Sequence, residues 1–271
     1  MPELPEVETV RRSLNRLVKG KRIRDVVLHY PKLAESPTEM VERLRNRTIR
    51  EVLRHGKFLV FDLGDTVLLS HLRMEGKYFL KESIVSPGKH DHVDFVFDDG
   101  ETLRYHDVRK FGTFHVRSAH DYTKHPPLSN IGWEPIDPDY PWGQLYIAAH
   151  KSRRPIKSVL LDQSVVSGLG NIYVDETLYC AGVHPSCYAH EISEAAYAAI
   201  ERCARKVLEK AITLGGSSIR SYTDSLGISG RFQNELNVHM REHQSCPQCG
   251  ARIEKIKVGG RGTYVCPHCQ R

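Results

Sequence analysis

The 271-residue sequence contains no apolar run long enough to cross a membrane, and its N-terminus carries glutamates instead of an apolar signal core. These two absences exclude a membrane-spanning protein and make a cytoplasmic location the expectation. The sequence also has no internal repeat and no low-complexity tract, so a repeat architecture is not expected. The charged fraction of 27% is ordinary for a globular protein, which argues against extensive disorder.

The sequence also argues against a protein held together by a disulfide framework, because seven cysteines are an odd number and no secretion signal accompanies them. Cys180, Cys187 and Cys203 are scattered, and we expect them to be buried structural residues. The other four form two Cys-x2-Cys pairs separated by sixteen residues, namely Cys246, Cys249, Cys266 and Cys269. This spacing predicts a zinc ribbon in which four thiolates fill the tetrahedral shell of one structural Zn²⁺.

The composition that is present allows one large domain or two modest ones, since 40% of the residues are hydrophobic. The formal net charge is +6. A mild basic excess of this kind suits a polyanionic partner such as a nucleic acid.

The N-terminal half is predicted to hold a helix followed by short strands. Pro5 opens the helix, Val7, Val10 and Leu14 form its apolar stripe, and Gly20 ends it. The expected strands are Ile23–Leu28, Thr48–Leu53, Phe58–Leu63, Val67–His71, Lys77–Leu80, Val93–Phe97, Thr102–His106 and Thr113–Val116, with a helix at Thr38–Arg45. Strands at this spacing favour a sandwich or a barrel.

The remainder is predicted to be mainly helical after a proline-rich linker at residues 125–142. The expected helices are Ile156–Asp162, Asn171–Ala181 and Ser193–Leu214. Residues 216–243 have no clear period and are interpreted as a loop followed by a strand. Two short strands, Ile253–Val258 and Thr263–Val265, make a hairpin inside the zinc ribbon.

Two glycine-rich segments are candidate phosphate sites. At the predicted hairpin tip, Gly259–Gly262, Arg261 has neighbours that present no side chains, so its guanidinium can approach a phosphate closely. The alternative is a solvated arginine in a flexible turn. The Ser167–Asn171 turn leads into a helix N-terminus, which binds anions readily; a tight turn between helices needs glycine equally.

Two loop segments carry side chains that suit a distorted duplex. Met74 lies between two predicted strands, at an expected hairpin tip, where it would be exposed and able to wedge between bases. Arg109 and Phe111 stand two residues apart on another strand-to-loop edge and can fill the space left by an extruded base. The alternative is that Met74 only fills the core, as a lone methionine ordinarily does.

The first residues offer a nucleophile. Pro2 is small enough that removal of Met1 is expected, which would leave a secondary amine able to attack a carbonyl-like carbon and form an imine. Glu3 beside it is a candidate for proton transfer. The alternative is that the early proline only sets the entry of the helix.

Together these segments resemble the formamidopyrimidine-DNA glycosylase family over nearly the whole chain. The similar segments are Met1–Thr9, Arg54–Lys57, His71–Gly76, Lys89–His92, Asp107–Thr113, Gly168–Glu176 and the C-terminal cysteines. The resemblance implies a bifunctional base-excision repair enzyme. Such enzymes remove oxidised purines such as 8-oxoguanine and formamidopyrimidines from duplex DNA through a Schiff base on the N-terminal proline, and then cleave the abasic site by β,δ-elimination.

The same resemblance implies an α+β fold. An N-terminal helix and antiparallel β-sandwich (1–124) would precede the linker (125–142), a helix–two-turns–helix domain (143–238) and the zinc-ribbon finger (239–271). It implies one structural Zn²⁺ and no organic cofactor. It also implies a monomer that acts on damaged double-stranded DNA in the bacterial nucleoid, with no membrane partner.

Roles for individual residues also follow from the resemblance. Pro2 would be the nucleophile, Glu3 the general acid/base, Lys57 a phosphate contact that assists β-elimination, and Arg261 the grip on the phosphate linked to δ-elimination. Further DNA contacts would be His71, Met74, His90, Arg109, Phe111, Lys151 or Arg153, and Asn171. Around the lesion would lie Glu6, Glu75, and Ser217, Ile219, Arg220 and Tyr222 of the covering loop.

Two other functions remain compatible with these residues. An endonuclease VIII-like enzyme would remove oxidised pyrimidines, but Leu4-Pro5 and the Arg109–Phe111 pair favour purines. A zinc-ribbon DNA-binding protein without catalysis would bind duplexes with a strong dependence on salt. Against that second alternative stand Pro2, Glu3 and Lys57.

Overall fold

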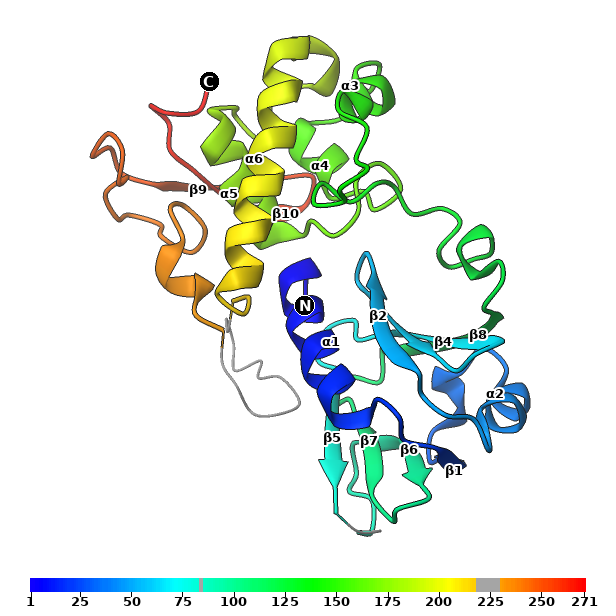
Figure 1. Ribbon diagram of the computed structural model, residues 1–271. Helices are drawn as coiled ribbons and strands as arrows, with labels where there is room; N and C mark the ends of the chain where they lie inside the picture. The colour runs from blue at the N-terminus through cyan, green and yellow to red at the C-terminus, as the bar shows by residue number, and fades with distance from the viewer. Residues whose placement is uncertain (83–84, 218–229) are drawn as a thin grey trace. The chain divides into compact units, whose positions relative to one another are not determined.

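The computed structural model describes residues 1–82, 85–217 and 230–271, which form two compact units (Figure 1). The first unit consists mainly of Glu6–Ser129 with Met1–Pro2. The second consists of Asn130–Ser217 and Arg231–Arg271, together with Glu3–Pro5 from the N-terminus. Among the described residues, no helix is both long enough and apolar enough to cross a membrane.

Among its described residues, the first unit contains two four-stranded antiparallel sheets. The strand order of one sheet is β1-β6-β7-β5, and its members are β1 (Ile23–Leu28), β6 (Asp91–Phe97), β7 (Thr102–His106) and β5 (Lys77–Lys81). The order of the other is β2-β3-β4-β8, with β2 (Glu51–His55), β3 (Phe58–Asp62), β4 (Thr66–His71) and β8 (Thr113–Ser118). The sandwich alternative is therefore confirmed.

One apolar core joins the elements of this unit. Helix α1 (Leu4–Val18) contributes Val7, Val10 and Leu14, the stripe that the sequence predicts. Helix α2 (Pro37–Leu44) adds Met40 and Leu44, and both sheets contribute buried side chains. Burial of these apolar surfaces is the main stabilisation of the unit.

The predicted hairpin between β4 and β5 is wrong. Each strand forms where it is expected, but β4 pairs with β3 and β8 whereas β5 pairs with β7. The segment 72–76 thus passes from one sheet to the other. Sequence periodicity identifies a strand and its buried face but does not select its partner strand.

The second unit contains four α-helices and a two-stranded hairpin. They are α3 (Gln144–Ala149), α4 (Ile156–Leu160), α5 (Asn171–Ala181), α6 (Glu194–Thr213), β9 (Glu254–Val258) and β10 (Arg261–Val265). The long α6 runs beside α5 (Figure 1). Gly182, with φ +69°, ends α5, and the hydroxyl of Ser193 accepts a hydrogen bond from Ala196 N at the start of α6. With the sandwich, this arrangement confirms the predicted α+β class.

The strand expected after the loop is absent from the described residues 230–243. A short 3₁₀ helix, Phe232–Glu235, occupies part of this segment. The backbone amides of Asn237, Val238 and His239 then donate to the carboxylate of Glu176 in α5. These amides are paired with a side chain and do not form a sheet ladder.

The expectation that the scattered cysteines are buried structural residues is also wrong. Cys180 is exposed and Cys203 is half-buried, and a disulfide joins them across α5 and α6. Packing of the two helices brings their Cα atoms to 5.8 Å, a separation that suits a disulfide. Cys187 is a half-buried free thiol.

Candidate active site and metal centre

Glu3 is held at the start of α5 in the second unit. Its Oε1 accepts a hydrogen bond from Ile172 N at 3.0 Å, and its Oε2 accepts one from Tyr173 N at 3.3 Å. The side chain is only 3% exposed. A helix N-terminus offers unpaired amides and a positive dipole end, so it stabilises a carboxylate there. At this turn, which the sequence offers as a phosphate site or as a tight interhelical turn, the two amides bind the chain's own Glu3.

Two glycines make this seat possible. A Cβ on Gly170 would lie 2.3 Å from Glu3 Cδ, and a Cβ on Gly168 would lie 2.3 Å from Leu4 Cδ1. The amide of Leu4 also donates to Gly168 O at 3.1 Å. A larger residue at either glycine would force Glu3 or Leu4 to shift, and at Gly168 it would also be strained by the φ of +87°.

Asn171 lies beside the residue that follows Arg261, because α5 contacts the ribbon hairpin. Asn171 Nδ2 donates to Gly262 O at 3.0 Å, and Gly262 follows Arg261 directly. The turn itself is Gly259–Gly260, with φ +54° and +78°, which is typical of a two-residue hairpin turn. Arg261 is thus the exposed first residue of β10 rather than part of the tip.

A set of basic side chains gathers in the first unit around the end of β4. Lys57 is buried, and its charge together with that of Arg73 contributes to lowering the pKa of His71. Burial is the largest cause of this shift, which takes the His71 pKa to about 3. The neutral imidazole accepts a hydrogen bond from Arg73 N at its Nδ1, at 2.9 Å.

The loop that carries Met74 and the loop that carries Arg109 and Phe111 contact the same buried residue of the first unit, Tyr105. A Cβ on Gly76 or on Gly112 would lie 2.2 or 1.8 Å from the hydroxyl of Tyr105. Both loops therefore pack against this tyrosine. Met74 is 37% exposed, which confirms the exposure that the sequence predicts for it.

The loop that carries Arg109 and Phe111 is tied to a buried acid. Asp107 accepts hydrogen bonds from the amides of Arg109, Phe111 and Gly112, each at 2.9 Å. The guanidinium of Arg109 lies over the Phe111 ring at 4.7 Å, as a cation–π pair. The pair is prearranged, with Phe111 exposed and Lys110 in a left-handed conformation between the two.

The other predicted residues divide between the units. His90 is half-buried, with its ring 5.8 Å from that of His106. Glu6 is buried and Glu75 exposed in the first unit, whereas Lys151 and Arg153 are exposed and Ser217 is buried in the second. Pro2 is buried and belongs to the first unit. Ile219, Arg220 and Tyr222 lie outside the described residues.

Sequence reasoning missed the acids and the tyrosine that hold these groups. Asp107 and Glu176 are 0% and 1% exposed, and Tyr105 is fully buried. For Asp107 there was a signal, since this acid stands between a predicted strand and a turn, whereas Glu176 had none because it lies between Asp175 and Thr177 in a predicted helix. For Tyr105 none existed, because an aromatic residue in a strand is ordinary core.

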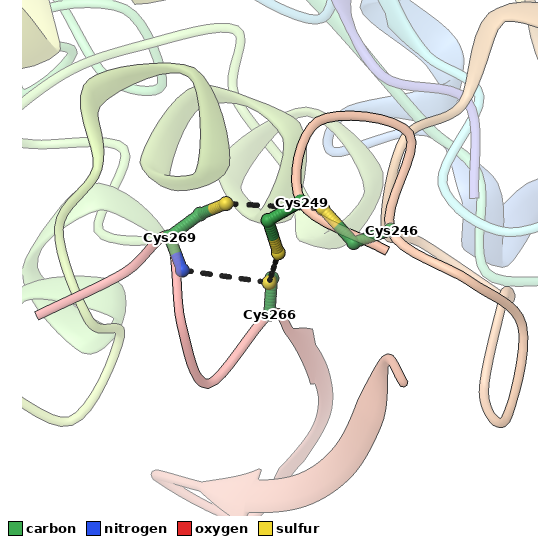
Figure 2. Close-up of side chains that lie close together, drawn as sticks. All are labelled: Cys246, Cys249, Cys266 and Cys269. Carbon is green, nitrogen blue, oxygen red and sulfur yellow. Dashed lines mark hydrogen bonds between the residues drawn. The ribbon is translucent and has the colours of Figure 1, made fainter. Parts of the chain in front are cut away.

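The four C-terminal cysteines converge on one point (Figure 2). Their sulfur atoms all lie within 4.8 Å of one another, with Cys246 and Cys269 at 3.8 Å and Cys249 and Cys266 at 3.5 Å. A tetrahedron of thiolates around zinc has edges of about 3.8 Å, so the set fits one structural Zn²⁺ with no open position. The hydroxyl of Tyr179 in α5 lies 3.2 Å from Cys246 Sγ and links the ribbon to the helix.

The fold and the site define a class of protein that combines a β-sandwich, a helical unit and a zinc ribbon with four thiolates. Three family models match these parts in the same order along the chain. They are the formamidopyrimidine-DNA glycosylase N-terminal domain over residues 1–114, the H2TH domain of the same family over 131–223, and a zinc finger found in FPG and IleRS over 244–271. The chain therefore belongs to the formamidopyrimidine-DNA glycosylase family.

Individual relatives agree with this assignment. Formamidopyrimidine-DNA glycosylases from Cytobacillus firmus and Bacillus subtilis are 47% and 46% identical to the chain, and the matches cover all of it and 100% and 99% of the relatives. A Lactococcus lactis Fpg solved with abasic-site DNA is similar with a TM-score of 0.92 and 42% identity. The same enzyme with an N7-benzyl-Fapy-dG DNA gives 0.92 and 43%, and both comparisons cover each chain completely.

Proposed function

We propose that the protein is a bifunctional DNA glycosylase and abasic-site lyase of base-excision repair. It removes oxidised purines from duplex DNA, in agreement with the names of its relatives and with the abasic and Fapy-dG DNA in the similar structures. The observation that carries the proposal for this chain is the seat of Glu3. A carboxylate fixed at a helix N-terminus stands one peptide bond from Pro2.

In the proposed reaction, Pro2 acts once Met1 has been removed; Met1 is 53% exposed and so accessible for removal. The Pro2 nitrogen forms a bond to C1′ of the lesion nucleotide while the bond from C1′ to the base breaks. The Glu3 carboxylate accepts the proton that the Pro2 nitrogen loses and passes it to O4′ as the bond between C1′ and O4′ opens, which leaves an iminium linkage to the open sugar. The released base takes a proton from water. The resulting Schiff base makes the C2′ proton acidic.

Two cations then assist departure of the phosphates. Loss of the C2′ proton expels the 3′ phosphate, and Lys57 stabilises its charge. Arg261 binds the other phosphate, which leaves in the second elimination. Asn171, His71, His90 and Lys151 or Arg153 hold the backbone, and Met74, Arg109 and Phe111 fill the space of the flipped nucleotide. The protein acts as a monomer on bacterial nucleoid DNA.

Borohydride trapping tests the nucleophile. Reduction during reaction with a duplex containing 8-oxoguanine is expected to give one covalent adduct per chain, at the mass of the protein without Met1 plus the lesion strand without its excised base. The Pro2→Gly variant should trap far less. Retention of Met1 with undiminished trapping, or full trapping by Pro2→Gly after Met1 removal, would rule out the assignment.

The lesion class is tested by excision from matched duplexes that contain 8-oxoguanine or thymine glycol. Faster release of 8-oxoguanine is expected, because the similar structures hold purine-derived lesions and the Arg109–Phe111 loop is prearranged. Faster release of thymine glycol would instead support the oxidised-pyrimidine alternative. A monomer is expected on size exclusion with and without DNA.

A further inference from the structure

A buried ionic cluster lies behind the hairpin that carries Arg261. Lys157 of α4, Asp175 of α5 and His239 are 0%, 1% and 6% exposed. Asp175 joins the other two, since its Oδ1 accepts from Lys157 Nζ at 2.7 Å and its Oδ2 from His239 Nδ1 at 2.8 Å. The proposed chemistry uses none of these three side chains directly.

The cluster contacts the backbone of the hairpin at two residues, Gly262 and Tyr264. Lys157 Nζ donates to Gly262 O at 3.2 Å, the same carbonyl that Asn171 binds at 3.0 Å. Tyr264 N lies 3.4 Å from Asp175 Oδ2. Gly262 and Tyr264 stand one and three residues from Arg261, so the residues that follow the arginine are fixed by side chains of α4 and α5.

Packing confirms that the hairpin is seated on α4. A Cβ on Gly259 would lie 2.3 Å from Ser158 Oγ, and Thr263 between the two backbone points is completely buried. The His239 ring meets the Tyr264 ring edge-on, with centroids 5.0 Å apart. Removal of the His239 contact is therefore expected to loosen β10 without removing a zinc ligand.

Both proposed catalytic groups of this unit lie within electrostatic reach of Lys157. Burial lowers its pKa, and the positive charge of Arg261 acts in the same direction, whereas Asp175 and Glu3 raise it. Three buried ionisable groups are costly compared with an apolar cluster, which favours a role in fixing geometry over one in stability.

We propose that Asp175 and His239, acting through Lys157, are positioning residues that align Arg261 with Asn171 for the phosphate. This inference rests on the proposed function. The guanidinium of Arg261 is effective only if β10 holds it in one position, since a displacement of about 1 Å can lower the rate on the order of a hundredfold.

The experiment compares full-length zinc-loaded variants. His239→Phe keeps the ring against Tyr264 but removes the donor, and His239→Asn restores an N–H near the position of Nδ1. Glu254→Gln, an exposed change on β9, is the matched control. His239→Phe is expected to cleave abasic DNA about tenfold more slowly at saturating DNA, with little change in KM. His239→Asn should recover most of this loss.

A double-mutant cycle with Arg261→Gln identifies the route. If His239 acts through Arg261, the double variant is no slower than Arg261→Gln alone. Amide exchange of Arg261–Val265 should be faster in His239→Phe at unchanged zinc content. If His239→Phe does not fold, Lys157→Met repeats the cycle with the contact to Gly262 removed.

The proposal would be overturned if the rate of the double variant fell by the product of the two single-variant losses. It would also be overturned if His239→Phe cleaved slowly while the amide exchange of Arg261–Val265 stayed unchanged. Failure of the proposed function is a different result, because then even the unaltered protein neither traps nor cleaves DNA. In that case the amide exchange of Arg261–Val265 in His239→Phe still shows whether His239 holds β10 in place.

Discussion

At the scale of single residues, the proposed chemistry depends on side chains that their surroundings hold in place. Glu3 is one, held by two amides of α5. His71 is another, because burial keeps its imidazole neutral while Arg73 N donates to it. Protonation of Nδ1 removes that acceptor and leaves the backbone of the Met74 loop without its anchor.

His71 makes stability depend on pH. The unfolded chain protonates this imidazole below its ordinary pKa of 6.5, but the folded protein does so only near pH 3. Between these values the unfolded state binds more protons, so the His71 contribution to the free energy of unfolding is complete above pH 6.5. It is lost as the pH falls, by at most about 1.4 kcal/mol per pH unit.

Denaturant unfolding of the protein and of His71→Gln between pH 7 and 4 measures this contribution. The free energy of unfolding should fall more steeply for the unaltered protein. Parallel pH profiles would show that His71 does not carry the effect.

At the scale of elements, sequence predicts local structure well and pairing poorly. The bounds of β1, β7 and α5 are confirmed to the residue, because Gly and Asp turns or Gly182 mark their ends. The contact of Glu3 with Ile172 joins residues 169 positions apart, and no periodicity encodes it. The same limit hid the division of β4 and β5 between two sheets and the proximity of Cys180 to Cys203.

The Cys180–Cys203 bond stabilises the α5–α6 pair. It closes a loop with a sequence separation of 23, for which the loss of unfolded-chain entropy corresponds to about 3 kcal/mol. Addition of a reductant that does not bind zinc should lower Tm by several degrees. Cys203→Ser should start at the lower Tm and show no further decrease, while Cys187→Ser should behave like the unaltered protein. An unchanged Tm on reduction would contradict this stabilising role.

At the scale of the whole molecule, the formal charge of +6 favours association with a polyanion. Each phosphate contact that a cation makes adds about 0.9 to the slope of log K against log salt concentration. Lys151 and Arg153 are exposed and have no ion-pair partner among the residues that the structure describes. At least one of them is therefore expected to contact a phosphate.

Binding of abasic duplex by Lys151→Gln/Arg153→Gln across a salt series tests this contact. The slope should decrease by about 1 for one contact and by about 2 for two. Lys32→Gln, an exposed change in the first unit, should leave it unchanged. A double variant with the slope of the unaltered protein would remove both residues from the interface.

The seat of Glu3 also has a consequence for biosynthesis. The acid leaves the ribosome among the first residues, but the turn and helix end that receive it are made 169 residues later. At about 5–20 residues per second, roughly 10 to 30 s separate the two events. During that interval the proposed nucleophile, Pro2, stands on the nascent chain beside an acid that is not yet held in place. With the roles proposed for Pro2 and Glu3, the order of synthesis would delay competence for strand cleavage until most of the protein has been made.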